Sequence, residues 1–345
     1  MANGQWYPPE WPDRMRALAD GTLTPVPPRR AATVMLLKDT EATEATEATE
    51  ATEATEATEA TEATEATKDT KDTRDTRGGE GAGAALPGAG GIAVHMLRRR
   101  ASMAFAGGAY AYPGGGVDPR DHERLVAWAG PDRTEWAARL GVSEATEAQA
   151  IVCAAVRETY EEAGVLLAGP APDSVVSDTT GADWEADREA LVRRDLSFAE
   201  FLDRRGLVLR SDLLGAWTRW ITPEFEPRRY DTWFFVAALP EGQRTRNVST
   251  EADRTVWITP AEAAAGYDRG ELLMMPPTIA TLRQLRAYNT ADAALAAAAG
   301  RDLTPVIAQA RLENGELVLT WPGHAEFTKY LPAAHDGPNA EGPSA

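Results

Sequence analysis

Cysteine and long apolar runs are scarce in this chain of 345 residues. The single cysteine, Cys153, excludes an internal disulfide, and its place on an apolar helix arc indicates a core residue rather than a reactive thiol. No stretch approaches the ~18 consecutive apolar residues of a membrane-spanning helix, and no basic segment followed by an apolar run opens the chain. We therefore expect a cytoplasmic protein without a membrane partner.

Positive charge is also in short supply. The chain has 35 Lys and Arg against 53 Asp and Glu, a net charge of −18, of which residues 38–77 carry −8. Because an acidic surface repels the phosphate backbone of DNA or RNA, we expect no nucleic-acid partner.

A low-complexity repeat accounts for much of this acidity. Thirteen triplets run from Lys38 to Thr76, nine of them Glu-Ala-Thr. A period of three matches neither a helix nor a strand, so no face of the repeat becomes apolar. We expect a disordered or weakly helical insertion that continues into the Gly-rich segment 78–91 and joins two neighbouring strands. A docking role for this acidic arm stays open.

One helix gathers three carboxylates on a single arc. It begins near Glu144, and its last turns place Glu158, Glu161 and Glu162 within about 100° of one another. Like charges at these spacings destabilise a helix, and the negative end of the helix dipole adds to the repulsion. The pattern indicates a divalent cation, Mg²⁺ or Mn²⁺, although a solvated acidic face is the alternative. The opposite, apolar arc predicts packing against a sheet and holds Val152, Cys153, Val156, Tyr160 and Ala163.

A glycine turn lies upstream of this helix, in the run Ala111-Tyr112-Pro113-Gly114-Gly115-Gly116-Val117-Asp118. Three glycines let the backbone approach a ligand closely. Together with Arg157-Glu158-Thr159-Tyr160-Glu161-Glu162-Ala163-Gly164-Val165, the turn resembles the signature box of Nudix hydrolases, which cleave a diphosphate linked to another moiety.

The box departs from the usual pattern in its middle. Residues 117–156 separate the glycines from the arginine, where the usual box is much shorter, and Gln149 stands where its first glutamate is expected. Such an expansion resembles the acyl-coenzyme-A-diphosphatase-like branch, as do residues 157–168 and 217–239. The resemblance covers roughly residues 28–290.

This resemblance implies an α/β fold, an α/β/α sandwich with a mixed, curved sheet. It predicts an N-terminal extension at 1–27, a Nudix domain at 28–290 with insertions at 38–91 and 117–142, and a C-terminal helix, hairpin and tail at 291–345. The expected activity is metal-dependent hydrolysis of a nucleotide-type small molecule, foremost coenzyme A or its thioesters. A catalytically inactive binding or sensor module is the alternative, and a homodimer is possible.

The resemblance also implies roles for particular residues. Glu158 and Glu162 are the first expected metal ligands, and Glu161 is a third ligand or the base that orients water. Arg157 is expected to hold a carboxylate in place. The backbone of Gly115 and Gly116 would complete the site.

Three further groups are candidates outside the box. Glu251, late in the domain, is expected to assist metal or water. Arg228 and Arg229 lie in a turn and have the guanidinium forks that suit phosphate oxygens, with a surface salt bridge as the alternative. Trp128 and Trp136 are expected either to line a substrate wall or to pin the expansion to the domain.

Apolar runs and turn residues predict most of the long elements. We expect a short helix around Trp11, Met15 and Leu18, and helical structure over 185–205. Further helices should begin at Pro260, Pro276 and residue 291. Strands are expected at 33–37, 92–97, 213–221, 232–239 and 255–258, with a hairpin at 312–320.

Overall fold

A computed structural model describes residues 10–40, 90–103, 106–122, 124–313, 316–320 and 329–331. Its centre is an eight-stranded mixed sheet in the order β10-β2-β1-β9-β8-β11, to which β3 and β4 add at β2 and β1. β1 runs parallel to β9 and antiparallel to β2. The strands are β1 (Arg29–Thr40), β2 (Gly91–Arg99), β3 (Tyr110–Ala111), β4 (Gly114–Gly116), β8 (Gly215–Ile221), β9 (Tyr230–Ala238), β10 (Ala252–Ile258) and β11 (Val306–Ile307).

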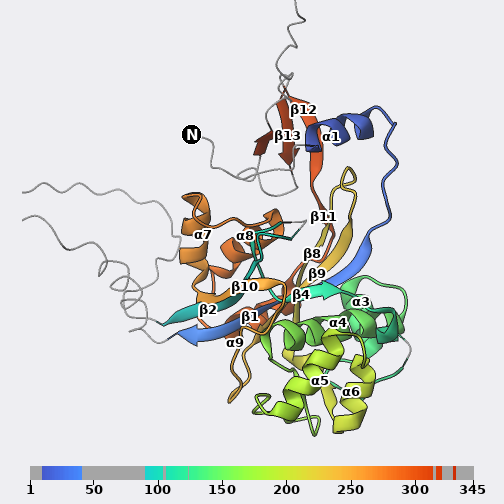
Figure 1. The fold of residues 1–345 in the computed structure, drawn as a ribbon, viewed down its shortest axis with the longest axis vertical. Helices are drawn as coiled ribbons and strands as arrows, with labels where there is room; N and C mark the ends of the chain where they lie inside the picture. The colour runs from blue at the N-terminus through green and yellow to red at the C-terminus, as the bar shows by residue number, and fades with distance from the viewer. Residues whose placement is uncertain are drawn as a thin grey trace, which may run out of the picture.

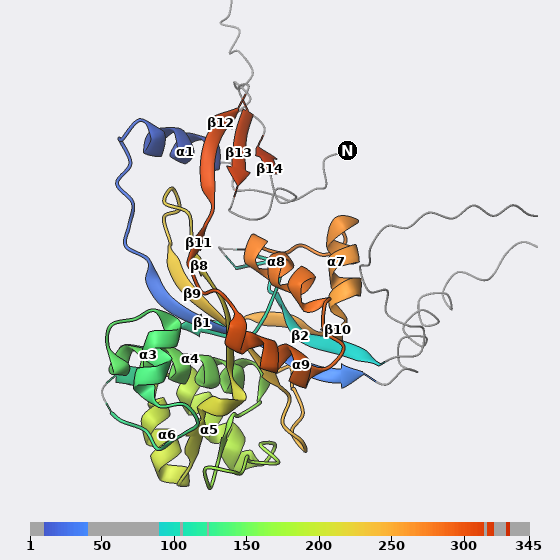
Figure 2. The same ribbon diagram turned by 180° about the vertical axis from the view of Figure 1, so that it is seen from behind.

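Helices cover both faces of this sheet, so the predicted α/β/α sandwich is confirmed (Figures 1 and 2). On one face lie α3 (Arg133–Leu140) and α4 (Ala145–Ala163), with α5 (Ala182–Val192) and α6 (Phe198–Arg205) beyond them. The opposite face packs against α1 (Trp11–Ala19), α7 (Pro260–Asp268), α8 (Pro276–Leu285) and α9 (Ala291–Ala297).

Short elements complete the described chain. A three-stranded sheet beside α4 joins β5 (Trp128–Ala129), β6 (Ala168–Gly169) and β7 (Val208–Arg210). A second small sheet joins β12 (Gln309–Glu313), β13 (Glu316–Thr320) and β14 (Lys329–Leu331). The 3-10 helices are η1 (Pro119–His122), η2 (Ser211–Leu213) and η3 (Ala298–Gly300). Among the described residues, no helix combines the length and apolar character that a membrane crossing requires.

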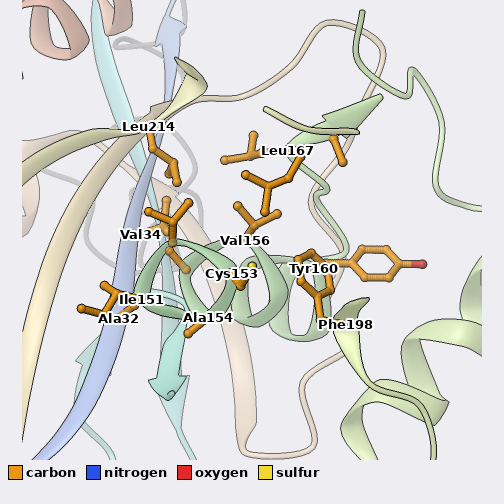
Figure 3. Packing of buried hydrophobic residues seen from close by; sticks show 14 of the residues in the cluster. Ala32, Val34, Ile151, Cys153, Ala154, Val156, Tyr160, Leu167, Phe198 and Leu214 are labelled. Atoms are coloured by element: carbon orange, nitrogen blue, oxygen red, sulfur yellow. The ribbon is translucent and has the colours of Figure 1, made fainter. Parts of the chain in front are cut away.

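The pleat of β1 divides its side chains between two cores. Ala32 and Val34 face α4, whereas Met35 and Leu37 belong to the core under α7 and α8. Figure 3 shows Ala32 and Val34 opposite Ile151, with Cys153, Val156 and Tyr160 farther along α4. Cys153 is buried, and burial raises its pKa well above the usual range, so it is a core residue as expected. Packing at this helix face therefore fixes how α4 lies on the sheet.

The strands that flank the repeat are neighbours, as predicted, because Thr40 at the end of β1 is paired with Gly91 at the start of β2. The repeat itself, residues 41–89, lies outside the described residues. The predicted hairpin at 312–320 agrees with the antiparallel pair β12 and β13, although its turn, 314–315, is also outside them.

The proposed domain boundaries remain a prediction, but elements beyond both of them share a core with the central sheet. Trp11 and Met15 of α1 belong to the same apolar cluster as Trp217 of β8. Ala291 and Ala294 of α9 belong to it as well. Elements on both sides of the expected domain therefore help to bury one face of the sheet.

Candidate active site

The C-terminal turns of α4 meet the glycine turn at β4. A carboxylate oxygen of Glu162 accepts a hydrogen bond from the backbone N–H of Gly114 at 2.8 Å. The carboxylate of Glu158 lies so close to Gly115 that a Cβ atom there would stand 2.6 Å from it. A larger residue at position 115 would therefore push the Glu158 carboxylate away from the turn.

Arg157 is the basic centre of the cluster. Its Nη1 donates to Glu158 at 2.7 Å and to Glu161 at 3.2 Å. Its Nη2 donates to the carbonyl of Gly116 at 2.8 Å and to Asp121 at 3.4 Å. One buried guanidinium thus joins two carboxylates of α4 to the glycine turn and to η1. Burial opposes its charge, but these carboxylates raise its pKa, so Arg157 stays positive.

The three glutamates carry more negative charge than their surroundings compensate. Burial raises the pKa of Glu158, and that of Glu161 rises to about 7 through burial and the neighbouring Glu158 charge. The pKa of Glu162 is also raised, by burial first and by the Glu158 charge second, while the hydrogen bond from Gly114 and the charge of Arg99 lower it. Buried carboxylates remain charged only when cations or donors offset the loss of water.

A divalent cation fits this donor set. In the part of the chain that the structure describes, no three His, Cys, Asp or Glu side chains converge as metal ligands, because Arg157 holds Glu158 and Glu161 while Gly114 holds Glu162. Their oxygens are nevertheless the hard ligands that Mg²⁺ and Mn²⁺ prefer. Arg157 is bonded to two of these carboxylates, those of Glu158 and Glu161.

Glu251 lies beside this cluster, next to the start of β10. Its charge raises the pKa of both Glu158 and Glu162, and its side chain is 59% exposed. Arg99, at the end of β2, stands 3.9 Å from Glu251 and lowers the pKa of Glu162. The structure therefore brings together Arg157, the three glutamates, Gly115, Gly116 and Glu251.

Arg228 and Arg229 are not part of this group. Arg229 is buried and donates to the backbone carbonyls of Thr222 and Val26, at 3.0 and 2.8 Å. The two arginines line a pocket with Arg29 and Tyr230. By strand alternation, Arg29 and Tyr230 point to the face that carries α8 rather than α4. A phosphate contact from these arginines would thus be separate from the carboxylates.

A family model that describes the NUDT19 Nudix domain matches residues 131–285. Over these residues the chain is similar to Nudix hydrolases. The predicted resemblance to the branch with an expanded box is confirmed by the same match, and the predicted fold agrees with a solved structure. That structure, a Nudix hydrolase from Alicyclobacillus acidocaldarius, aligns with a TM-score of 0.54 and 23% identity over 81% of this chain and 99% of that one.

The curated relatives align with this chain over a smaller share of their own length than that structure does. An acyl-coenzyme A diphosphatase NUDT19 of Xenopus laevis is 25% identical over 269 residues, 67% of this chain and 70% of that protein. The protein of the same name from Gallus gallus is 28% identical over 232 residues, 56% of this chain and 61% of that protein. The matched region therefore leaves about a third of each relative unaligned.

Gln149 in the Nudix box is a structural residue. Its buried amide oxygen accepts hydrogen bonds from Arg133 Nε at 2.7 Å and from the N–H of Val126 at 3.4 Å. The amide nitrogen donates to the carbonyls of Arg124 and Asp121, at 2.8 and 3.3 Å. All four positions of the amide are used, so Gln149 ties the expansion to α4. A glutamate here would lack the two donors.

The tryptophans of the expansion hold it against the domain rather than line the substrate site. Trp136 is 4% exposed and packs against Phe235 of β9, with ring centroids 5.9 Å apart. Trp128 donates to the carbonyl of Pro131 and stacks under Arg133. The burial of Trp136 favours the alternative that the tryptophans pin the expansion to the domain, because its ring is enclosed by the core.

Sequence reasoning missed Asp121, which is buried against Arg157. Burial raises its pKa to about 6, in spite of the opposing charge of Arg157. Asp118, three residues earlier, receives Arg120 on both carboxylate oxygens. The signal was the Asp-x-x-Asp spacing immediately after the glycine turn, which brings two carboxylates back toward Arg157.

Proposed function

We propose that this protein is a divalent-metal-dependent diphosphatase that acts on coenzyme A or an acyl-coenzyme A. The observation that carries the proposal is the group of buried glutamates at the end of α4, whose negative charge exceeds the positive charge that contacts it. The names of the relatives supply the substrate class.

In this proposal Glu158, Glu161 and Glu162 hold Mg²⁺ or Mn²⁺. The ion would neutralise the phosphate oxygens and lower the pKa of the attacking water. Gly115 leaves room for the Glu158 carboxylate, and the N–H of Gly114 orients Glu162. Arg157 keeps Glu158 and Glu161 on the side of the glycine turn, so it acts as a positioning residue.

Two carboxylates are available to take the proton of the attacking water. Glu251 is largely exposed beside the cluster, and Glu161 lies inside it. If Glu251 is the base, E251Q should lower kcat without weakening metal affinity, whereas E161Q should weaken both if Glu161 is a ligand.

The test is turnover of a substrate panel. Coenzyme A, acetyl- and longer acyl-coenzyme A, ADP-ribose, NADH and a dinucleoside polyphosphate are incubated with Mg²⁺, with Mn²⁺ or with a chelator. We expect cleavage of the coenzyme A compounds that requires metal and yields 3′-phospho-AMP and a 4′-phosphopantetheine product. Metal-independent turnover, or a preference for another member of the panel, would contradict the proposal. Binding without turnover would favour a sensor module.

A further inference from the structure

A pocket lies between the segment that leads into β1 and the hairpin that joins β8 to β9. Residues 26–29 line it on one side and residues 227–230 on the other, and its volume is about 760 Å³. Figures 1 and 2 both show the chain from α1 to β1 running alongside this hairpin. A volume of this size is typical of sites for small molecules.

Arg229 holds the two sides of the pocket together. Its buried side chain donates to the carbonyl of Thr222 within the hairpin at 3.0 Å, and to the carbonyl of Val26 across the pocket at 2.8 Å. The backbone carbonyl of Arg229 accepts a further hydrogen bond from the N–H of Arg29 at 2.9 Å. These contacts form the pocket before any ligand enters, which lowers the entropy lost on binding.

The charge in the pocket is positive and is not offset by bonded partners. Arg29 and Arg228 are exposed, and neither side chain has a hydrogen bond or ion pair among the residues that the structure describes. Arg30, the next residue of β1, differs because it lies on the other face of the sheet and pairs with Glu147 at 2.8 Å. The described residues that line the pocket include three arginines and no Asp or Glu. In a chain with a net charge of −18, such a group of arginines is a local attraction for anions.

The rest of the lining is apolar or aromatic. Tyr230 and Val26 are among the few exposed large side chains of this kind, and both face the pocket. Three prolines, Pro27, Pro28 and Pro227, complete the walls. An aromatic ring beside guanidinium groups offers a stacking surface for a base and charged donors for its phosphate.

We propose that this pocket binds a nucleoside phosphate at a site separate from the carboxylates of α4. Arg29 and Arg228 contact the phosphate, because free guanidinium forks match its oxygens in charge and in geometry. Tyr230 stacks on the base. The ligand is a free nucleotide or the nucleotide end of coenzyme A, which present the same chemistry to the pocket. Binding here requires neither a metal nor turnover, so the inference goes beyond the proposed function.

Calorimetry with AMP in the presence of a chelator tests the site. Without a cation the carboxylates of α4 repel anions, so they do not compete for the probe. We expect the wild type to bind AMP more tightly than adenosine or inorganic phosphate. R29A and R228A should each weaken AMP binding about tenfold or more, since each removes charge-assisted hydrogen bonds. Both side chains are exposed and unpaired, so the melting temperatures should stay within about 2 °C of the wild type.

The variant Y230L separates recognition of the base from recognition of the phosphate. It keeps an apolar side chain but removes the ring, so AMP binding should weaken about fivefold or more. Binding of inorganic phosphate should be unchanged. An equal loss for the two probes would overturn the assignment of a nucleoside to this pocket.

R30A is the matched control. It removes the same charge one residue away on β1, from a side chain on the other face that is paired with Glu147, and its Kd for AMP should stay within twofold of the wild type. E158Q should also bind AMP as the wild type does, because the two sites are separate. The inference fails if the wild type does not bind AMP, or if R29A and R228A bind it within twofold of the wild type. An equal loss in R30A or in E158Q would overturn it as well, because the probe would then respond to the general field or bind at the carboxylates.

Steady-state kinetics distinguishes the two sources of the nucleotide. If the pocket holds the nucleotide end of the substrate, R228A should raise the KM for coenzyme A about tenfold as well as weaken AMP binding. If it holds a separate nucleotide, AMP binding falls while this KM is unchanged, and both results support the site. A raised KM with unchanged AMP binding would contradict it. If the wild type hydrolyses nothing in the panel, the proposed function fails, and calorimetry still decides whether the pocket binds a nucleotide.

Discussion

The two ends of helix α4 differ in how completely their buried polar side chains are hydrogen-bonded. Near its start, Gln149 is buried and all four hydrogen-bonding positions of its amide are occupied. Near its end, Glu158, Glu161 and Glu162 share one arginine and one backbone N–H as close donors. The helix is continuous between them, so the difference lies in the partners that surrounding segments supply.

The difference separates a structural group from a functional one. A neutral amide with complete hydrogen bonding stabilises a single arrangement of the expansion around α4. Buried carboxylates with too few donors cost stability unless something else binds them. The proposed metal would supply the missing partner, and the raised pKa values follow from the same deficit of donors.

The largest expected effect comes from neutralising the functional end. E158Q and E162Q should each reduce kcat/KM by about a hundredfold or more, because each removes a charged ligand from the site. Their apo melting temperatures should equal or exceed that of the wild type, since a buried like charge is lost. Steady-state kinetics and circular dichroism check both parts.

Glu147, near the start of the same helix, is paired with Arg30 at 2.8 Å and provides the control. E147Q should leave kcat/KM within a few fold. If E158Q and E162Q unfolded along with losing activity, the contrast between the two ends of α4 would disappear.

A substitution of Gln149, at the start of α4, should lower stability and leave activity largely unchanged. Q149A removes one hydrogen-bond partner of Arg133 and leaves buried backbone groups of the expansion without theirs, which should lower the free energy of unfolding by about 2–4 kcal/mol. The folded fraction should keep most of its kcat. Urea denaturation and active-site-normalised kinetics measure the two quantities. A Q149A protein of wild-type stability but no activity would make Gln149 a site residue.

His95 extends the comparison to a buried polar side chain without hydrogen bonds. Neither ring nitrogen has a partner within the described residues, and the ring lies 5.3 Å from that of Trp257. Burial lowers the pKa of His95 from 6.5 to about 4. The unfolded chain therefore binds a proton between these values while the folded protein does not, so stability falls as the pH drops from 6.5 toward 4.

The variant H95L removes this proton linkage. The wild type should lose up to about 3 kcal/mol more than H95L on going from pH 7 to pH 4, at 1.36 kcal/mol per pKa unit. Above pH 7 the stability difference between the two proteins should be constant. Parallel stability curves from pH 7 to pH 4 would mean that His95 is protonated in the folded state as readily as in the unfolded one.

Long elements of this fold could be predicted from the sequence, and short ones could not. The apolar runs that became β1, β2 and β9 are long enough to show what they bury. β5, β6 and β11 have two residues each, too few for any periodicity, and are defined by the strands they pair with. Such strands form only because they pair with others in the fold, so the local sequence does not predict them.

The same limit applies to the site. Helical spacing alone brought Glu158, Glu161 and Glu162 together, since all three lie on one element. Asp121 reaches the cluster through the turn after β4, and the geometry of that turn depends on contacts made elsewhere in the fold. Side-chain chemistry suggested phosphate for Arg229, but two nearby carbonyls satisfy the same donors.

Removing the acidic repeat should have the smallest effect. The deletion tests whether the repeat contributes to the stability or to the activity that we associate with the two ends of α4. Deleting Glu41 to Thr76 leaves residues 77–89 to connect β1 and β2, whose ends are already paired at Thr40 and Gly91. The triplet period offers no apolar face to bury, and loop-closure cost changes slowly with length. We expect turnover of coenzyme A within a few fold and a melting temperature that does not fall.

The control replaces residues 41–76 by a Gly-Ser linker of equal length, which keeps the loop size but removes the charge. A large drop in melting temperature for both proteins would show that the repeat packs on the domain. An equal change in KM in the two proteins, both of which lack the acidic residues, would instead mean that these residues act on substrate binding. The site would then include the repeat as well as the end of α4.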